Sequence, residues 1–165
     1  MRVMGLDIGD RTVGVAMSDE GGRVAQGVCV VRRTDPERDV AAIRDLAVRH
    51  GVGMLVAGLP RALRGQIGPQ AEKVLGFVTA LRTGSGLPVA LWDERLSTRA
   101  AERTLREAGV RRQRRRSLVD QVAATLILQG FLDARPPWEG PAALADDDGG
   151  RPTPDGARTA LGPEE

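Results

Sequence analysis

Three short apolar runs follow one another within the first 31 residues, and this spacing leaves room for little except connected β-strands. The runs cover residues 2–8, 13–17 and 24–31. Each is too short for a typical helix, and Gly21-Gly22 between the last two is typical of a tight hairpin turn. The sequence therefore predicts three consecutive strands joined by hairpin connections.

The segments that follow alternate between helical and strand patterns. Asp35 and Pro36 are typical of a helix start, with Asp35 as the N-cap and Pro36 in the first turn. The remaining expected elements are helices over 36–50, from Pro69, over 97–109 and over about 117–133, and strands over 54–57 and 89–92. This order predicts an α/β fold with a mixed five-stranded sheet, its first three strands antiparallel, flanked by helices.

Charge and composition divide the chain near residue 135. Residues 1–135 contain 22 Lys and Arg against 15 Asp and Glu, whereas residues 136–165 contain 2 against 7. The second segment also holds six Pro and five Gly, and such a segment buries too little apolar surface to offset the entropy of ordering it. We expect one domain over 1–135 and a disordered acidic tail over 136–165.

Several classes of protein are disfavoured by what the sequence lacks. No apolar run reaches the ~18 residues of a membrane-spanning helix, and the N-terminus has no pattern of a secretory leader. Cys29 is the one cysteine, so it has no partner for an internal disulfide and cannot form a zinc site alone. We therefore expect a soluble cytoplasmic protein that does not bind membranes.

Three acidic residues occupy positions where strands end. Asp7 lies near the end of the first predicted strand among apolar residues and glycine, where a carboxylate is costly unless it is paired or binds a cation. Asp93 and Glu94 follow the last predicted strand, and reactive groups of α/β sheets gather at strand carboxyl ends. Successive strand residues face opposite sides, so one of this pair should join Asp7. We favour Glu94 and keep Asp93 as a supporting or alternative ligand.

Asp120 falls on the apolar side of the last predicted helix. At about 100° per residue, it lies with Ala123, Ala124, Ile127 and Phe131. The polar side of the same helix carries Gln121, Thr125, Gln129 and Asp133. The helix should therefore turn Asp120 towards the sheet and bring a third carboxylate to the strand ends.

Each acid also has a non-catalytic interpretation. Asp7 could accept hydrogen bonds from the amides of Gly9 and Asp10. Asp120 could lie near a helix N-terminus, where the helix dipole favours an acid. The pair after the last strand could be solvated loop charges.

Converging carboxylates without histidine or cysteine are the hard oxygen ligands that Mg²⁺ or Mn²⁺ prefers. One or two such ions held by Asp7, Glu94 and Asp120 would suit phosphodiester hydrolysis, because the ions activate water and stabilise the attacking and leaving oxygens. General acid–base catalysis by two carboxylates is the alternative, and it leaves the third acid without a role.

Five arginines lie within six residues just ahead of the Asp120 helix, in a segment that we predict to be a loop overhanging the acidic site. They are Arg111, Arg112, Arg114, Arg115 and Arg116. A solvated basic loop is possible, but repulsion among five like charges favours an anionic partner such as nucleic acid. We expect four more arginines at the same edge, Arg61, Arg64, Arg95 and Arg99. With no Tyr, two Trp and two Phe, a base-stacking platform is not expected.

Five motif blocks, in this order, resemble the YqgF (RuvX) family over about residues 1–134. The blocks are Leu6-Asp7-Ile8-Gly9 with Gly14-Val15-Ala16-Met17-Ser18-Asp19, Gly58-Leu59-Pro60, Gly65 with Gly68-Pro69, Asp93-Glu94-Arg95-Leu96-Ser97-Thr98, and Val119-Asp120-Gln121-Val122-Ala123-Ala124 with Ile127-Leu128-Gln129. The family is described both as Holliday junction resolvases and as pre-16S rRNA nucleases. The resemblance implies a ribonuclease H-like fold, a divalent metal and nuclease activity, with the family's acidic residues at Asp7, Glu94 (with Asp93) and Asp120.

The chain departs from the usual family pattern at two positions. Arg64 stands where Asn or Asp commonly precedes the glycine, and Thr12 stands where Arg is frequent. Both departures bear on contacts with the substrate rather than on the metal site.

We therefore expect a metal-dependent nuclease that matures the 5′ end of pre-16S rRNA in ribosome biogenesis. A DNA junction resolvase is the alternative and would need a two-fold dimer, so both a monomer and a homodimer stay open. A catalytically inactive nucleic-acid-binding module is a third possibility. A phosphotransferase of the actin and sugar-kinase type is disfavoured, because it clamps its nucleotide between two such domains.

Overall fold

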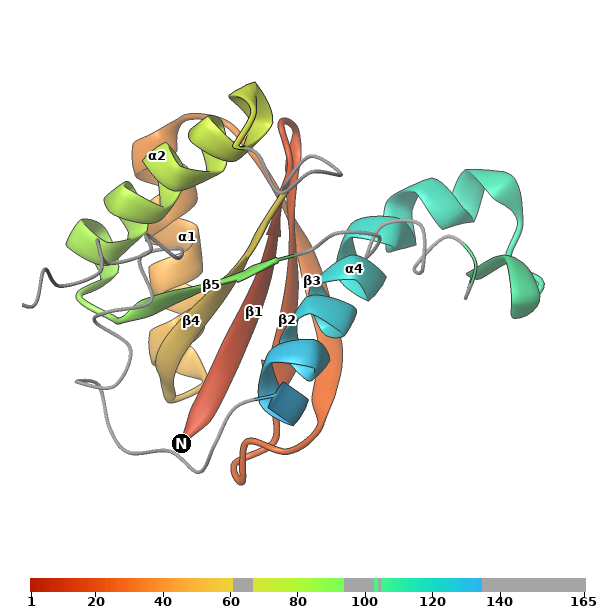
Figure 1. The fold of residues 1–165 in the computed structure, drawn as a ribbon, viewed down its shortest axis with the longest axis horizontal. Helices are drawn as coiled ribbons and strands as arrows, with labels where there is room; N and C mark the ends of the chain where they lie inside the picture. Colours follow the sequence, from red (N-terminus) through yellow and green to blue (C-terminus); the bar gives the residue numbers. More distant parts are fainter. Residues whose placement is uncertain (61–66, 94–102, 104, 135–165) are drawn as a thin grey trace, which may run out of the picture.

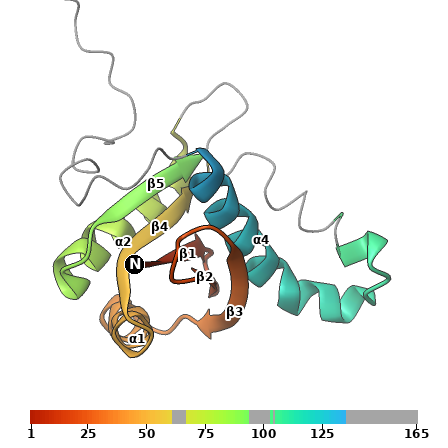
Figure 2. The ribbon, with the colours of Figure 1, turned by 90° about the horizontal axis from the view of Figure 1, so that it is seen from below.

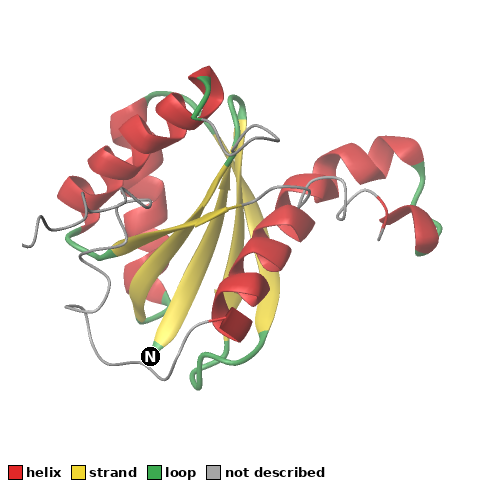
Figure 3. Cartoon of the chain, viewed as in Figure 1, coloured by secondary structure: helices red, strands yellow, loops and turns green. Residues whose placement is uncertain are grey.

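One mixed sheet organises the molecule (Figures 1 and 3). The structure is a computed structural model and describes residues 1–60, 67–93, 103 and 105–134. The strands are β1 (Arg2–Ile8), β2 (Thr12–Ser18), β3 (Ala25–Arg32), β4 (Val52–Leu59) and β5 (Val89–Asp93). They lie in the order β3-β2-β1-β4-β5, in which β1, β2 and β3 are antiparallel neighbours and β4 and β5 continue parallel to β1. The predicted mixed five-stranded sheet, with its first three strands antiparallel, is confirmed.

Helices cover both faces of this sheet (Figure 2). The helices α1 (Pro36–Arg49) and α2 (Pro69–Ser85) lie on one face, and α4 (Arg112–Ala134) lies on the other. The Asp35 carboxylate accepts a hydrogen bond from the Arg38 amide at 3.0 Å, so Asp35 is the N-cap that the sequence predicted. Within the part of the chain that the structure describes, no helix is both long enough and apolar enough to cross a membrane.

The strict alternation of the strands separates two apolar cores. On β1, Leu6 and Ile8 pack with the residues of α1 and α2, whereas Val3 packs with those of α4. Gly5 also lies on the α4 side, because a Cβ there would stand 2.6 Å from the Leu128 Cβ and 3.0 Å from the Ala124 oxygen. Asp7 follows two residues later and therefore shares the α4 face.

Glycine is what allows α4 to lie directly on the sheet. A Cβ built at Gly14 of β2 would overlap the main-chain carbonyl group of Asp120. A helix backbone cannot give way as the end of a flexible side chain can. The approach of α4 to β1 and β2 therefore depends on two positions without side chains, Gly5 and Gly14.

The predicted start of the last helix is wrong. α4 begins at Arg112 rather than at about Ser117, so the segment we expected as an arginine-rich loop forms the first turns of the helix. These turns extend past β3 and beyond the sheet (Figures 1 and 2). A helical segment that has no sheet beneath it needs no apolar face, so its sequence shows no helical periodicity of apolar residues. Arginine is nevertheless a good helix former, which is consistent with the helix observed here.

The connection between β2 and β3 is wider than a two-residue hairpin. It spans residues 19–24 and is closed by the Asp19 amide, which donates to the Val24 oxygen at 3.0 Å. Gly22 adopts φ +66° within it, a left-handed conformation that favours glycine. The predicted turn is therefore present at Gly21-Gly22, in a longer form.

Two predictions concern residues that are only partly described. For the helix expected over 97–109, residues 103 and 105–107 are helical and Gly109 ends the segment at φ +73°. The predicted tail over 136–165 lies outside the described residues, so the domain boundary at residue 135 stays a prediction.

Candidate active site

Asp7 is the second-last residue of β1 and lies half-buried on the α4 face. Its partner across the antiparallel ladder is Gly14, the glycine on which α4 rests. The amide of Gly9 donates to the Thr12 oxygen at 2.9 Å. The turn after Asp7 is therefore closed by the main chain of Thr12.

Asp120 lies in the interior of α4, more than two turns from the helix start at Arg112. An explanation by the helix dipole is therefore wrong, because that effect is confined to the first turn. The main chain of Asp120 packs on Gly14, and its side-chain Oδ2 accepts a short hydrogen bond from the Thr12 hydroxyl. Asp120 thus faces the sheet, as its angular position on the helix predicted.

Gly14 links the main chains of Asp7 and Asp120. Directly opposed residues of antiparallel strands have Cα atoms about 4.5–5.5 Å apart, so the glycine under Asp120 is also the cross-strand neighbour of Asp7. Because β1, β4 and β5 are parallel, their carboxyl ends lie at this same edge. The structure therefore places Asp7 and Asp120 on the same face of the sheet, on either side of Gly14.

The third predicted acid lies next to the last described residue of β5. Asp93 is in register with Leu59, which belongs to the core under α1 and α2, whereas Trp92 packs in the α4 core. The alternation thus assigns Asp93 to the face opposite Asp7. Glu94 lies outside the described residues. Among the residues that are described, no group of three His, Cys, Asp or Glu side chains could hold a metal ion.

The donor chemistry of the two described acids fits a hard divalent cation. Asp7 and Asp120 are both half-buried carboxylates on one face of one sheet edge. The Thr12 hydroxyl, which donates to the Asp120 carboxylate, is neutral and does not cancel the negative charge of that carboxylate. Oxygen donors of this kind suit Mg²⁺ or Mn²⁺ rather than zinc.

An ion pair between the partly buried Arg33 and the buried Asp39 holds the turn that follows Asp7. The Arg33 guanidinium donates to the Gly9 oxygen at 2.8 Å and pairs with the Asp39 carboxylate at 3.2 Å. It also lies over the Phe77 ring, 4.6 Å from the ring centre. Asp39 is 2% exposed and accepts a further hydrogen bond from the Thr34 amide at 2.9 Å.

Sequence reasoning missed this ion pair. The one signal was an acid directly beside Val40 on the apolar side of the first helix, where a charge needs a partner. Nothing in the pattern pointed to Arg33 as that partner. The pair matters to the site because it fixes Gly9, two residues from Asp7.

Four of the five clustered arginines lie on the same helix as Asp120 instead of on a loop above it. Arg111 precedes α4 and Arg114 is in its first turns, and both are exposed. Arg116 precedes Asp120 by one turn, about 6 Å along the helix axis. The predicted contacts Arg61, Arg64, Arg95 and Arg99 lie outside the described residues.

The three described aromatic rings are all engaged inside the protein. Trp92 and Phe131 meet edge to face, with ring centres 6.1 Å apart, and Phe77 is covered by Arg33. None of these rings forms an exposed platform for bases. Trp138 lies beyond the residues that the structure describes.

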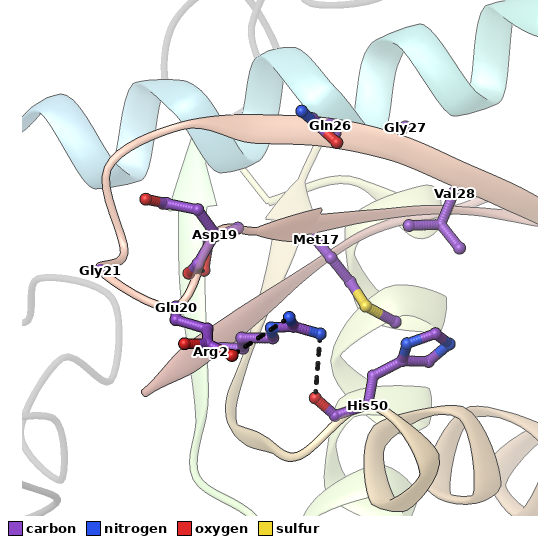
Figure 4. Close-up of a pocket in the computed structure, with 10 residues that line it drawn as sticks. Arg2, Met17, Asp19, Glu20, Gly21, Gln26, Gly27, Val28 and His50 are labelled. Atoms are coloured by element: carbon purple, nitrogen blue, oxygen red, sulfur yellow. Dashed lines mark hydrogen bonds and ion pairs between the residues drawn. The ribbon is translucent and has the colours of Figure 1, made fainter.

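A pocket of about 610 Å³ lies at the opposite end of the sheet (Figure 4). Arg2 and His50 line it, and the Arg2 guanidinium is engaged by the His50 oxygen and the Glu20 carboxylate, each at 3.5 Å. Arg2 begins the strand that Asp7 nearly ends, about 17 Å away at the rise of a β-strand. This pocket and the lone histidine are therefore separate from the carboxylates.

Comparisons with known proteins agree with this geometry. A family model described as "RuvX: Holliday junction resolvase" matches residues 1–134. A protein of Moorella thermoacetica named "Putative pre-16S rRNA nuclease" is 54% identical over 133 residues, which are 81% of this chain and 95% of that protein. A protein of the same name from Myxococcus xanthus is 54% identical over 138 residues, covering 83% of this chain and 91% of that protein.

A solved structure shares the fold. It is described as "T. thermophilus RuvC in complex with Holliday junction substrate" and matches with a TM-score of 0.51 at 18% identity, over 81% of this chain and 97% of that one. This likeness confirms the ribonuclease H-like arrangement of the sheet. With the family match over residues 1–134 and relatives at 54% identity, it establishes that this chain belongs to the RuvX family.

Proposed function

We propose that this protein is a divalent-metal-dependent nuclease that hydrolyses phosphodiester bonds during maturation of the 5′ end of pre-16S rRNA in the cytoplasm. The observation that carries the proposal is the seating of Asp120 on Gly14, directly across the ladder from Asp7. Relatives named for pre-16S rRNA, at 54% identity over most of the chain, favour precursor ribosomal RNA as the substrate.

The proposed metal ligands are Asp7, Asp120 and Glu94. Glu94 is preferred over Asp93 as the third ligand because Asp93 lies on the face of the sheet opposite Asp7. Three carboxylates with no nitrogen or sulfur ligand fit Mg²⁺ or Mn²⁺. Asp93 stays a supporting or alternative ligand in this proposal.

The chemistry that such an ion supplies is activation of a water molecule and neutralisation of charge on the phosphate. The chain's own residues hold and orient the donors. Asp7 and Asp120 present their carboxylates from a strand and a helix that are packed together through Gly14. The Arg33 contact to Gly9 restrains the turn after Asp7. A site built on rigid elements in this way keeps its geometry without reorganising during the reaction.

Substrate binding is assigned to arginines that contact the phosphate backbone. Arg111 and Arg114 are exposed at the start of the helix that carries Asp120. The other proposed phosphate contacts are Arg112, Arg115 and Arg116 from the same run, together with Arg61, Arg64, Arg95 and Arg99. Arginine binds phosphate through a planar fork of donors. Recognition is therefore proposed to rest on backbone and shape rather than on stacked bases.

The proposal is tested by incubating the protein with a precursor 16S 5′ leader and, separately, with a four-way DNA junction, in Mn²⁺, Mg²⁺ or EDTA. We expect cleavage of the RNA with either ion and none with EDTA. Asp7→Asn and Asp120→Asn should each lower the rate about 100-fold or more, because a lost ligand removes several kcal/mol of transition-state stabilisation. Asp45→Asn, at an exposed acid of α1, is the matched control and should cleave like the wild type.

Cleavage that survives EDTA would contradict the metal-dependent mechanism. Binding of RNA without any cleavage, unchanged in Asp7→Asn, would instead identify an inactive nucleic-acid-binding module.

A DNA junction resolvase is the second candidate, because the matching family model carries that description and RuvC shares the fold. Symmetric cleavage of a junction requires two active sites related by a two-fold axis. This candidate therefore predicts paired cuts in the four-way junction and a homodimer in sedimentation. A monomer that cuts only the RNA leader would exclude it.

A further inference from the structure

The hydroxyl of Thr12 makes the one side-chain hydrogen bond described for the Asp120 carboxylate. Thr12 begins β2 and lies 108 residues from Asp120 in the sequence. The hydroxyl donates to Oδ2 of Asp120. A carboxylate has two oxygens, each able to accept more than one hydrogen bond or cation, so this contact leaves Oδ1 available for another donor or for a metal.

Thr12 is itself held in place by the turn that follows Asp7. Its main-chain oxygen accepts the Gly9 amide at 2.9 Å, and its Cα is in register with Arg32 of β3. Threonine is branched at Cβ and has restricted side-chain rotation. The sheet therefore fixes the position of the Thr12 hydroxyl, and the hydroxyl in turn restrains the side chain of Asp120 on α4.

The charge of the contact matters as much as its geometry. The threonine hydroxyl orients the carboxylate and keeps its negative charge available. The sequence had linked Thr12 to substrate contacts, whereas the structure links it to Asp120.

We propose that Thr12 is a positioning residue that fixes the rotamer of Asp120 and so would hold its carboxylate ready for a divalent ion. The inference rests on the proposed function, because it gives Thr12 a role in the same metal site. Groups that orient metal ligands in this way typically contribute 10- to 100-fold to metal affinity or activity.

The experiment compares Thr12→Val, Thr12→Ala and Thr12→Ser with the wild type. Valine keeps the branched shape without the hydroxyl, alanine removes the hydroxyl without adding a methyl group, and serine restores a hydroxyl. Thr125→Val is the matched control, since the Thr125 hydroxyl donates at 2.9 Å to the Gln121 oxygen of its own helix and not to an acid. Mn²⁺ binding is measured directly, from the loss of the free Mn²⁺ signal in electron paramagnetic resonance, and thermal unfolding in EDTA verifies that each variant folds.

We expect Thr12→Val and Thr12→Ala to raise the Mn²⁺ dissociation constant about 10-fold. The Mn²⁺ concentration for half-maximal cleavage should rise by the same factor, while the KM for RNA at saturating Mn²⁺ stays unchanged. Thr12→Ser should recover most of the affinity, and Thr125→Val should match the wild type. A residue that served only packing would change thermal unfolding but would not be rescued in Mn²⁺ affinity by serine.

Failure of this inference is distinguishable from failure of the proposed function. Equal Mn²⁺ affinity in the wild type, Thr12→Val and Thr12→Ala overturns the role of Thr12 while leaving a metal-dependent nuclease intact. Weaker Mn²⁺ binding in both variants supports the role of Thr12 even if neither nucleic acid is cleaved. A wild-type protein that takes up no Mn²⁺ overturns both.

Discussion

At the scale of single residues, the site depends on a position that has no side chain. Gly14 is the contact at which the main chain of Asp120 meets β2, and its cross-strand partner is Asp7. The close approach of the Asp120 main chain to the cross-strand neighbour of Asp7 therefore requires a glycine at this position. A methyl group there would have to displace a helix backbone rather than a flexible side chain.

Gly14→Ala is expected to lower the free energy of unfolding by about 1–3 kcal/mol, the usual cost of overpacking, and to weaken Mn²⁺ binding by moving Asp120 away from Asp7. The measurements are urea denaturation and Mn²⁺ titration. Gly76→Ala is the control, because Gly76 lies within α2 and a Cβ there meets nothing within 4 Å. The free energy of unfolding of Gly76→Ala should rise by about 0.5–1 kcal/mol. Equal stability of Gly14→Ala and wild type would contradict the close contact.

The ion pair between Arg33 and Asp39 is the second prediction at this scale. Asp39 is 2% exposed, and removing one partner of a buried pair leaves the other uncompensated. Asp39→Ala should therefore lower the free energy of unfolding by about 3 kcal/mol, measured by urea denaturation. Asp45→Ala breaks the exposed pair with Arg44 and should cost less than about 1 kcal/mol. Similar losses in both variants would argue against a structural role for the buried pair.

At the scale of elements, the two ends of α4 have different roles. Its later turns cover the sheet, and its first turns carry arginines past β3 (Figure 1). Because the helix is continuous from Arg112 to Ala134, the basic turns and Asp120 have a fixed relationship. On the proposed function, phosphates bound by the arginines would be held at a set distance from Asp120.

Neutralising these turns should weaken nucleic-acid binding in a salt-dependent way. For Arg111→Gln with Arg114→Gln, we expect the slope of log K against log salt to fall by about 0.7 per lost contact for single strands and about 0.9 for duplex. Fluorescence anisotropy at several salt concentrations measures it. Arg44→Gln with Arg49→Gln, on α1 across the sheet, is the control with the same change in charge. A slope that falls equally in both double variants would mean that only net charge matters.

The connection between β2 and β3 gives a prediction for pH. Hydrogen bonds from the amides of Val24 and Arg23 lower the pKa of Asp19 below its ordinary value of 3.8. Since the folded pKa is lower than the unfolded one, the stabilising contribution is complete above about pH 3.8 and is lost as the pH falls through the folded value. The Asp19 carboxyl resonance should therefore titrate below pH 3.8, and the stability difference between wild type and Asp19→Asn should shrink in the same range. A titration at or above 3.8 would contradict these hydrogen bonds.

At the scale of the whole molecule, the periodicity of apolar residues in the sequence predicted the sheet and the helices that cover it. The expected strand over residues 2–8 is β1 as observed, and Asp35 with Pro36 marked the start of α1. The apolar angle of Asp120 predicted the face that α4 lays on the sheet. These features follow from local rules of alternation, capping and helical angle.

The remaining features depend on contacts that no local pattern encodes. The first turns of α4 have no surface beneath them and hence no apolar stripe. The bond from Thr12 to Asp120 joins residues 108 positions apart, and it forms only because Gly14 clears the path for the helix. The choice of Arg33 as the partner of Asp39 likewise depends on where the chain returns after β3.

The distance in sequence between the two described acids has a consequence during synthesis. Asp7 leaves the ribosome before α4, and α4 with Asp120 is not complete until residue 134 has been made. A nascent chain that already holds its first strands still lacks the helix that finishes the site. On the proposed function, the ribosome making this protein is therefore never exposed to a partly built enzyme able to cut RNA.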